Sequence, residues 1–346
     1  MMRRWLIAFA LALGAGALWA GAAFADASTY HSNYTNTTRA CAGCHRAHTG
    51  SGTMLIKSDT IYGLCTSCHG SNSGLDVVDG VEWQTDPTTH AKLPDLPPVG
   101  GTKGGGFVNS YMNTALTTTG PNGVLAPSTS AHKVEGMTGY TGDTVWGIGA
   151  IGSGPGSTFT LQCTTCHDPH GKSGADADGN AIPTYRLLRS NVAAKLPAAS
   201  GVVTVPEDSA TEHDYLVDST TQVYYGQTYT TDLRKLSDWC ATCHNRIHTD
   251  DASSDPATSA SGDAIYKFRH ATTGTSVENN FGTPTKWPSG SPACLTCHTA
   301  HGSSAAMTRQ AAQVPQPGTA EGGGTYLDSS LLRVDNRGVC ELCHNK

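Results

Sequence analysis

Six short motifs of the form C-x-x-C-H combine two thiols and an imidazole at fixed spacing in this sequence. The cysteine pairs are Cys41 and Cys44, Cys65 and Cys68, Cys163 and Cys166, Cys240 and Cys243, Cys294 and Cys297, and Cys340 and Cys343; the histidines that follow them are His45, His69, His167, His244, His298 and His344. Two thiols at this spacing can add to the vinyl groups of haem, and the adjacent histidine can then bind the iron. The motifs therefore predict six covalently bound haem c groups, with these histidines as proximal ligands.

Two other kinds of site use cysteine in a similar way. A disulfide framework is typical of a secreted, cysteine-rich chain, but it does not explain why a histidine follows every second cysteine. Six zinc sites would each still lack further ligands of a repeated kind. The six motifs use all 12 cysteines of the chain, which favours haem attachment over both alternatives.

Nine of the 15 histidines lie outside the motifs, and six of these nine flank the first, third and fifth motifs. They are the candidate distal iron ligands: His31, His48, His132, His170, His270 and His301. Three of them extend a motif to C-x-x-C-H-x-x-H, in which one helical turn offsets the two histidines by roughly 4.5 Å. The second histidine must therefore serve another haem, or else it is solvated or bonded to a propionate. Which histidine serves which haem stays open, as do the roles of His90, His213 and His248.

The histidine spacing divides the chain into three two-haem repeats, at about residues 31–69, 132–244 and 270–344. After each x-x-H comes a small-residue stretch and then an apolar and basic run, at residues 54–57, 185–189 and 331–333, of which the last two are the more alike. Insertions at 70–131 and 173–235 serve either haem shielding or assembly. The glycine- and proline-rich part of the first, residues 96–106, is typical of a loop. Residues 202–205 and 222–230 of the second favour a small hairpin.

The first 25 residues have the features of a secretory signal peptide. Arg3 and Arg4 precede an apolar run, and Ala23-Phe24-Ala25 offers a cleavage site. The run is short for a spanning helix, and no later segment is apolar enough, so no membrane span is expected in the mature chain. Without the two arginines the formal net charge changes from −6 to −8. Such a charge excludes nucleic acid as a partner.

Residues 26–346 are expected to form a single cytochrome with little regular secondary structure. Forty glycines and 17 prolines accompany only 38% hydrophobic residues, so side chains alone bury little apolar surface. We expect a mostly irregular, coil-rich chain with short helices at the haem motifs and minor β-hairpins, wrapped around a core made of a chain of haems.

The paired C-x-x-C-H-x-x-H motifs resemble those of the multihaem c-type cytochromes of metal-respiring bacteria. Haem number, signal peptide and Gly/Ser/Thr content resemble the hexahaem outer-surface cytochromes that polymerise into conductive filaments, or nanowires. The resemblance implies bis-histidine ligation at every haem, self-association, and a histidine near the N-terminus that ligates a haem of a neighbouring subunit. The matching position here is His31.

Three functions are compatible with these residues. The first is long-range electron transfer by an extracellular or outer-surface protein, for which the resemblance implies assembly into a filament, with other redox proteins or extracellular acceptors as partners. The second is a monomeric periplasmic electron shuttle. The third is a multihaem reductase, which needs one haem with an open position. No C-x-x-C-K motif occurs, and the histidines suffice for all six distal positions. These counts favour an electron-transfer protein over an enzyme.

Overall fold

The computed structural model describes 38–71, 73–86, 92–102, 104–112, 124–140, 143–144, 158–170, 174–175, 181–182, 185–190, 192, 217–218, 223–224, 231–244, 248–249, 270–271, 294–307, 329–333 and 335. The predicted signal peptide, His31, His90, His213 and the sixth motif, Cys340 to His344, lie outside these residues. In the part of the chain that is described, no helix is both long and apolar enough to cross a membrane.

Short helices carry all five described haem motifs, as expected. The helices are α2 (Thr38–Cys44), α3 (Ile61–His69), α4 (Cys163–Cys166), α5 (Thr231–Ala241) and α6 (Cys294–Cys297), with a 3-10 turn at Tyr185–Leu187. Helix α3 begins after Thr60, whose hydroxyl accepts a hydrogen bond from Gly63 N at 3.0 Å and so caps the first turn. It ends before Gly70.

The strands have two to four residues each. They are β1 (Leu75–Asp76), β2 (Val81–Trp83), β3 (Pro98–Gly101), β4 (Asn109–Met112), β5 (Val124–Pro127), β6 (Ser130–Ala131), β7 (Asp143–Thr144), β8 (Thr158–Phe159), β9 (Gly174–Ala175), β10 (Ala181–Ile182), β11 (Val217–Asp218), β12 (Val223–Tyr224), β13 (His248–Thr249), β14 (His270–Ala271) and β15 (Gly302–Ser303). All described pairings are antiparallel except that of β13 with β14. Mostly coil with short helices and hairpins, the fold class is as predicted.

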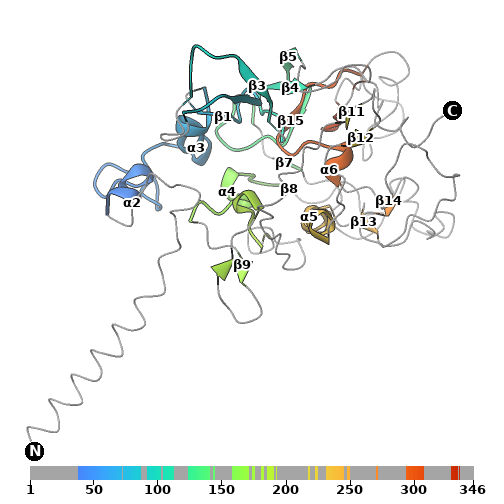
Figure 1. The fold of residues 1–346 in the computed structure, drawn as a ribbon. Helices are drawn as coiled ribbons and strands as arrows, with labels where there is room; N and C mark the ends of the chain where they lie inside the picture. Colours follow the sequence, from blue (N-terminus) through green and yellow to red (C-terminus); the bar gives the residue numbers. More distant parts are fainter. Residues whose placement is uncertain are drawn as a thin grey trace, which may run out of the picture.

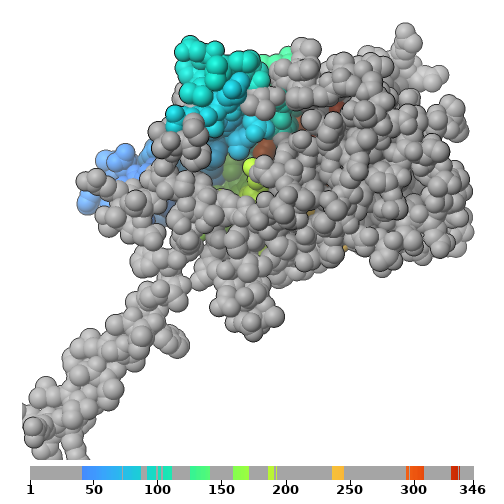
Figure 2. Space-filling view, viewed as in Figure 1, coloured from blue at the N-terminus to red at the C-terminus, as the bar shows by residue number. Residues whose placement is uncertain are grey.

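The first insertion is more ordered than its composition indicated. Strands β1, β2 and β3 form an antiparallel sheet, and β4 pairs with β5 over four residues. The prediction of a loop is therefore wrong at Pro98–Gly101, which is strand β3. A proline is tolerated there because it is the first residue of an edge strand. In Figure 1 these strands gather with β15 at the top of the molecule, above α4. Figure 2 shows the cyan segment of this insertion at the molecular surface.

The second insertion contains a hairpin of β11 and β12, at 217–224. Strand β12 lies within the predicted segment 222–230, but its partner is β11; the other predicted segment, residues 202–205, lies outside the described part of the chain. The last residues of this insertion, from Thr231 onward, already belong to α5.

Two small clusters of buried side chains join the haem motifs. Phe107, Val134 and Leu161 form one, with Tyr62 and Phe159 among the side chains packed against it. Leu188 and Leu236 form the other, with Trp239 and Leu295 against them. The second cluster brings together segments next to the third, fourth and fifth motifs. Such limited apolar packing agrees with the low hydrophobic content of the chain.

Candidate haem-binding site

The histidines of the first, third and fifth motifs have the same hydrogen-bond arrangement. In each, Nδ1 donates to a backbone carbonyl oxygen: His45 to Met54 at 2.8 Å, His167 to Arg186 at 2.7 Å and His298 to Ser330 at 3.0 Å. A carbonyl oxygen only accepts, so the proton is on Nδ1 and Nε2 keeps its lone pair. This is how a histidine is oriented to bind a metal through Nε2.

The acceptor carbonyls of Met54 and Arg186 belong to two of the apolar and basic runs that repeat in the sequence, and that of Ser330 immediately precedes the third run. Each run returns to its motif through two further backbone hydrogen bonds. The residue after the histidine donates to a leucine carbonyl, and the basic residue of the run donates to the carbonyl of the second cysteine: Arg46 to Leu55 and Lys57 to Cys44, Asp168 to Leu187 and Arg189 to Cys166, Thr299 to Leu331 and Arg333 to Cys297. These hydrogen bonds hold each run against its motif and help to orient the motif histidine.

A left-handed backbone turns each run toward its histidine. Leu55, Leu187 and Leu331 have φ values of 50°, 59° and 60°. This conformation costs an L-residue about 1 to 2 kcal/mol, and it recurs at three equivalent leucines. The strain is a shared feature of the histidine-orienting turn and would not be expected from the side chains alone.

The last two runs share a further contact. The guanidinium Nε donates to the carbonyl of the residue after the first cysteine, from Arg189 to Thr164 and from Arg333 to Leu295, both at 2.6 Å. Lys57 holds the equivalent place in the first run and has no guanidinium. The closer sequence likeness of the second and third runs thus has a structural reason.

Three pairs of imidazoles have their ring centres at similar distances. The ring centres of His45 and His170 are 6.3 Å apart, those of His167 and His301 6.2 Å, and those of His132 and His244 6.1 Å. Two histidine nitrogens on opposite sides of one metal each lie about 2 Å from it, which places the ring centres roughly 6 Å apart. Each pair joins a predicted proximal ligand to a predicted distal ligand, so the donor sets fit haem iron.

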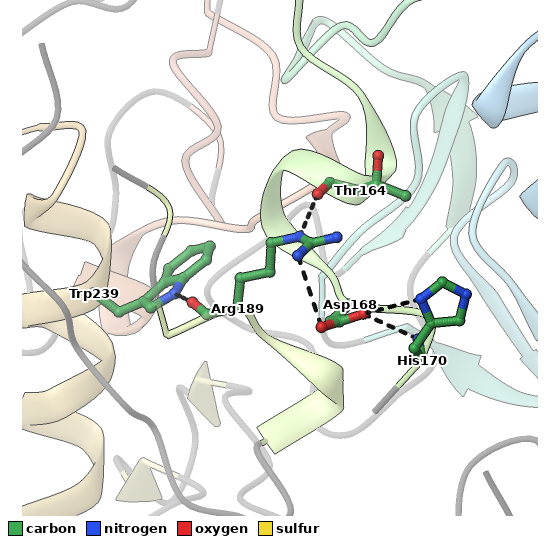
Figure 3. Close-up of polar contacts among 5 residues, drawn as sticks. All are labelled: Thr164, Asp168, His170, Arg189 and Trp239. Atoms are coloured by element: carbon green, nitrogen blue, oxygen red, sulfur yellow. Dashed lines mark hydrogen bonds and ion pairs between the residues drawn. The ribbon is translucent and has the colours of Figure 1, made fainter. Parts of the chain in front are cut away.

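His170 is oriented by an acidic and basic pair, shown in Figure 3. The Asp168 carboxylate accepts from His170 N at 3.0 Å and lies 3.9 Å from His170 Nδ1. Its other oxygen lies 3.7 Å from the Arg189 guanidinium, and Arg189 O accepts from the indole of Trp239 at 2.6 Å. The third motif, the return run and α5 thus jointly hold the x-x-H histidine.

His301 and His132 lie on adjacent strand ends. His132 N donates to His301 O at 2.9 Å, and His132 Nδ1 donates to Ala300 O at 2.6 Å. His301 N donates to Gly104 O at 2.6 Å, so the first insertion supports the same segment. Strands β6 and β15 pair next to these residues. The structure thereby brings two distal candidates from different repeats together.

Burial keeps two of the paired histidines neutral. It lowers the pKa of His167, while the Arg186 carbonyl opposes this shift and the charge of Arg189 adds to it. It lowers the pKa of His301 to about 3, and the adjacent His167 adds to the effect. Neutral imidazole is the form that binds a metal.

The ten described cysteines form no disulfide with one another. Cys65 lies close enough to Cys163 for the two thiols to shift each other's pKa, and Cys240 and Cys294 form a second such pair. Burial raises the pKa of Cys166 to about 12. Helix α3 contacts α4 and α5 contacts α6, so neighbouring motifs of different repeats lie together.

The other candidates are placed less fully. His48 is exposed on the turn after the first motif, and His69 ends α3. His270 lies in β14, in register with His248 of β13. Asp168, Arg189, Trp239 and Phe107 were not predicted to support the histidines. Of these four residues, only Arg189 lies in one of the repeated apolar and basic runs.

Comparison with known proteins agrees with the presence of paired C-x-x-C-H motifs. Residues 31–74 match the family model of the doubled CXXCH motif. The curated C-type cytochrome OmcS of Geobacter sulfurreducens is 26% identical over 262 residues, which are 60% of this chain and 55% of OmcS. The match thus spans about half the length of that relative.

Two solved structures are also similar. They are the cryo-EM structure of the OmcS nanowires and that of the Outer Membrane Cytochrome S filament, both from Geobacter sulfurreducens. Both are 18% identical, cover 88% of this chain and 98% of the solved chain, and have TM-scores of 0.38 and 0.36. The family match and the sequence relative confirm the resemblance drawn from the motifs: this chain carries a doubled CXXCH motif and is similar to the C-type cytochrome OmcS.

Proposed function

We propose that this protein binds six haems in a row, each between two histidines, and passes electrons along the row without transforming a substrate. Haem supplies an iron that alternates between the ferric and ferrous states. The residues of this chain attach it, supply both axial ligands and limit access of water. The observation that carries the proposal is the set of three imidazole pairs with ring centres 6.1 to 6.3 Å apart.

The three pairs follow one register. The x-x-H histidine of the third motif faces His45 of the first, and that of the fifth motif faces His167 of the third. The histidine that precedes the third motif faces the fourth-motif histidine. Extended to the whole chain, the register assigns His31 to the haem of His69 and His270 to the haem of His344.

Among the six motifs of this sequence, the register assigns no haem to the x-x-H histidine of the first motif, His48, and no distal histidine to the haem of the fifth motif. A second copy satisfies both if its His48 binds at the His298 haem of the first. A head-to-tail contact of this kind does not close and gives a filament. The solved OmcS assemblies are nanowires and a filament.

This assignment differs from the one that the resemblance implied, in which His31 ligates the neighbouring subunit. The two are separated by His48→Met and His31→Met in the full-length holoprotein. We expect His48→Met to prevent filament growth, and His31→Met to change the ligation of one haem while filaments persist. Negative-stain electron microscopy of native material measures growth, and the low-spin ferric signal measures ligation.

Several results would contradict the proposal. Loss of filaments in His31→Met alone would show that His31, and not His48, ligates a haem of the neighbouring subunit. Discrete particles from the unmodified protein would support the periplasmic shuttle instead. A mass that corresponds to fewer than six haems, or a high-spin iron in the resting protein, would contradict the bis-histidine row. Recovery of the protein from the cell surface rather than the periplasm would support an extracellular role.

A further inference from the structure

Phe107 of the first insertion lies against the imidazole of His301. The two ring centres are 4.8 Å apart and the planes differ by 27°. Phe107 is 8% exposed and is held edge-on by Tyr62 of α3, with ring centres 6.1 Å apart at 88°. An aromatic ring that is fixed in a buried cluster can fix the plane of the ring stacked on it.

His301 differs from four other histidines of the chain, in which a hydrogen bond from Nδ1 to a carbonyl oxygen orients the ring. Nδ1 donates to a carbonyl in His45, His132, His167 and His298. His301 Nδ1 is buried and has no hydrogen-bond partner among the described residues. The position of the ring therefore depends on the packing of Phe107 and on a backbone contact with Gly105.

Two glycines of the first insertion, Gly104 and Gly105, lie close to the segment that carries His301. A Cβ on Gly104 would lie 2.9 Å from His301 Nδ1, and one on Gly105 would lie 1.8 Å from the carbonyl oxygen of Gly302. Ser110, which is fully buried, donates to that same carbonyl at 3.0 Å. The insertion thus packs closely against the segment that carries His301.

We propose that Phe107 is a positioning residue for His301 and tunes the haem held between His167 and His301. This rests on the proposed bis-histidine ligation. The planes of His167 and His301 differ by 57°, against 16° for His45 and His170. The angle between two axial imidazoles affects the splitting of the iron d orbitals, and a loosely held imidazole donates less to ferric iron. Axial ligation and its surroundings are principal determinants of haem potential.

The test compares Phe107→Leu with Phe159→Leu in the holoprotein. Both variants remove a ring from the same cluster, but among the described contacts only Phe107 stacks on an imidazole. The haem concerned is identified beforehand as the one whose signal changes in His301→Met. Low-temperature EPR measures the low-spin ferric signal, and spectroelectrochemical titration measures each midpoint potential.

We expect Phe107→Leu to shift the EPR signal and raise the potential of that one haem. A threefold to tenfold change in its ferric to ferrous ratio at fixed potential corresponds to about 30 to 60 mV for one electron. Phe159→Leu should leave both readouts as in the unmodified protein. An unchanged Phe107→Leu, or an equal change in Phe159→Leu, would overturn the proposal.

A second variant, Gly104→Ala, tests the proposal if Phe107→Leu does not fold. Gly104→Ala keeps Phe107 and requires no left-handed backbone, since Gly104 has no positive φ, but its methyl group presses on the imidazole. The same haem should change, and an unchanged signal would overturn the proposal. Failure of the bis-histidine proposal is distinct, because it is visible in the unmodified protein as fewer haems or a high-spin iron.

Discussion

The imidazole of His167 lies 6.2 Å from that of His301, measured between ring centres, although the two belong to the third and fifth motifs. A proximal ligand and its facing histidine thus come from different repeats. The same holds for His45 of the first repeat, which faces His170 of the second. In the proposed bis-histidine ligation, a repeat therefore takes the x-x-H histidine of the next repeat as a distal ligand.

Replacement of single x-x-H histidines should change one haem each. His170→Met should act on the haem of His45, and His301→Met on that of His167, because methionine replaces imidazole only at the facing iron. Methionine ligation raises the potential of that haem. Near-infrared magnetic circular dichroism detects the new ligand, and changes spread evenly over all haems would contradict the pairing.

Asp168→Ala should loosen His170 and destabilise the fold. The carboxylate holds His170 N and the Arg189 guanidinium, with Asp168 and Arg189 side chains 13% and 24% exposed. Loss of a mostly buried acceptor of this kind costs about 1 to 3 kcal/mol. Urea unfolding followed by haem absorbance measures this cost.

Asp59→Ala is the matched control for Asp168→Ala. Asp59 is exposed and accepts from the Ser51 hydroxyl at 2.9 Å. We expect a change within about 0.5 kcal/mol. Equal costs for the two aspartates would show that Asp168 has no special role at His170.

Gly105→Ala should cost more than Gly139→Ala. Both glycines have positive φ, 71° and 75°, so alanine is strained at either place by about 1 to 2 kcal/mol. Only at Gly105 would the methyl group overlap the Gly302 carbonyl, whereas nothing lies within 4 Å of that position at Gly139. The urea midpoint should therefore fall further for Gly105→Ala, and equal midpoints would argue against close contact between the insertion and the His301 segment.

The chain without haem should be largely unfolded. Only 38% of the residues are hydrophobic, and among the described residues the two buried clusters contain two or three buried apolar side chains each. Such a composition offsets little of the conformational entropy of so long a chain. Expression without haem attachment, followed by far-ultraviolet circular dichroism and heating, tests this. A compact form that melts cooperatively would contradict it.

Local chemistry allowed much of this protein to be predicted from its sequence. The spacing of Cys163, Cys166 and His167 defines haem attachment, and each such motif favours a short helix. The similarity of residues 185–189 to 331–333 indicated a repeated element in the sequence, and the structure shows that this element contacts the motif histidine. Residues 98–101 were predicted as loop because glycine and proline disfavour strands, yet β2 supplies enough hydrogen bonds to make them a strand.

By itself, then, the sequence determined the haem sites, the supply of histidines and the coil-rich fold class, because these depend on residue type and short spacing. Only the tertiary structure decided that His170 faces His45, that His301 faces His167, and that Phe107 lies against His301. These contacts join residues far apart in the chain. They depend on how an insertion and three return runs pack, which no local pattern encodes.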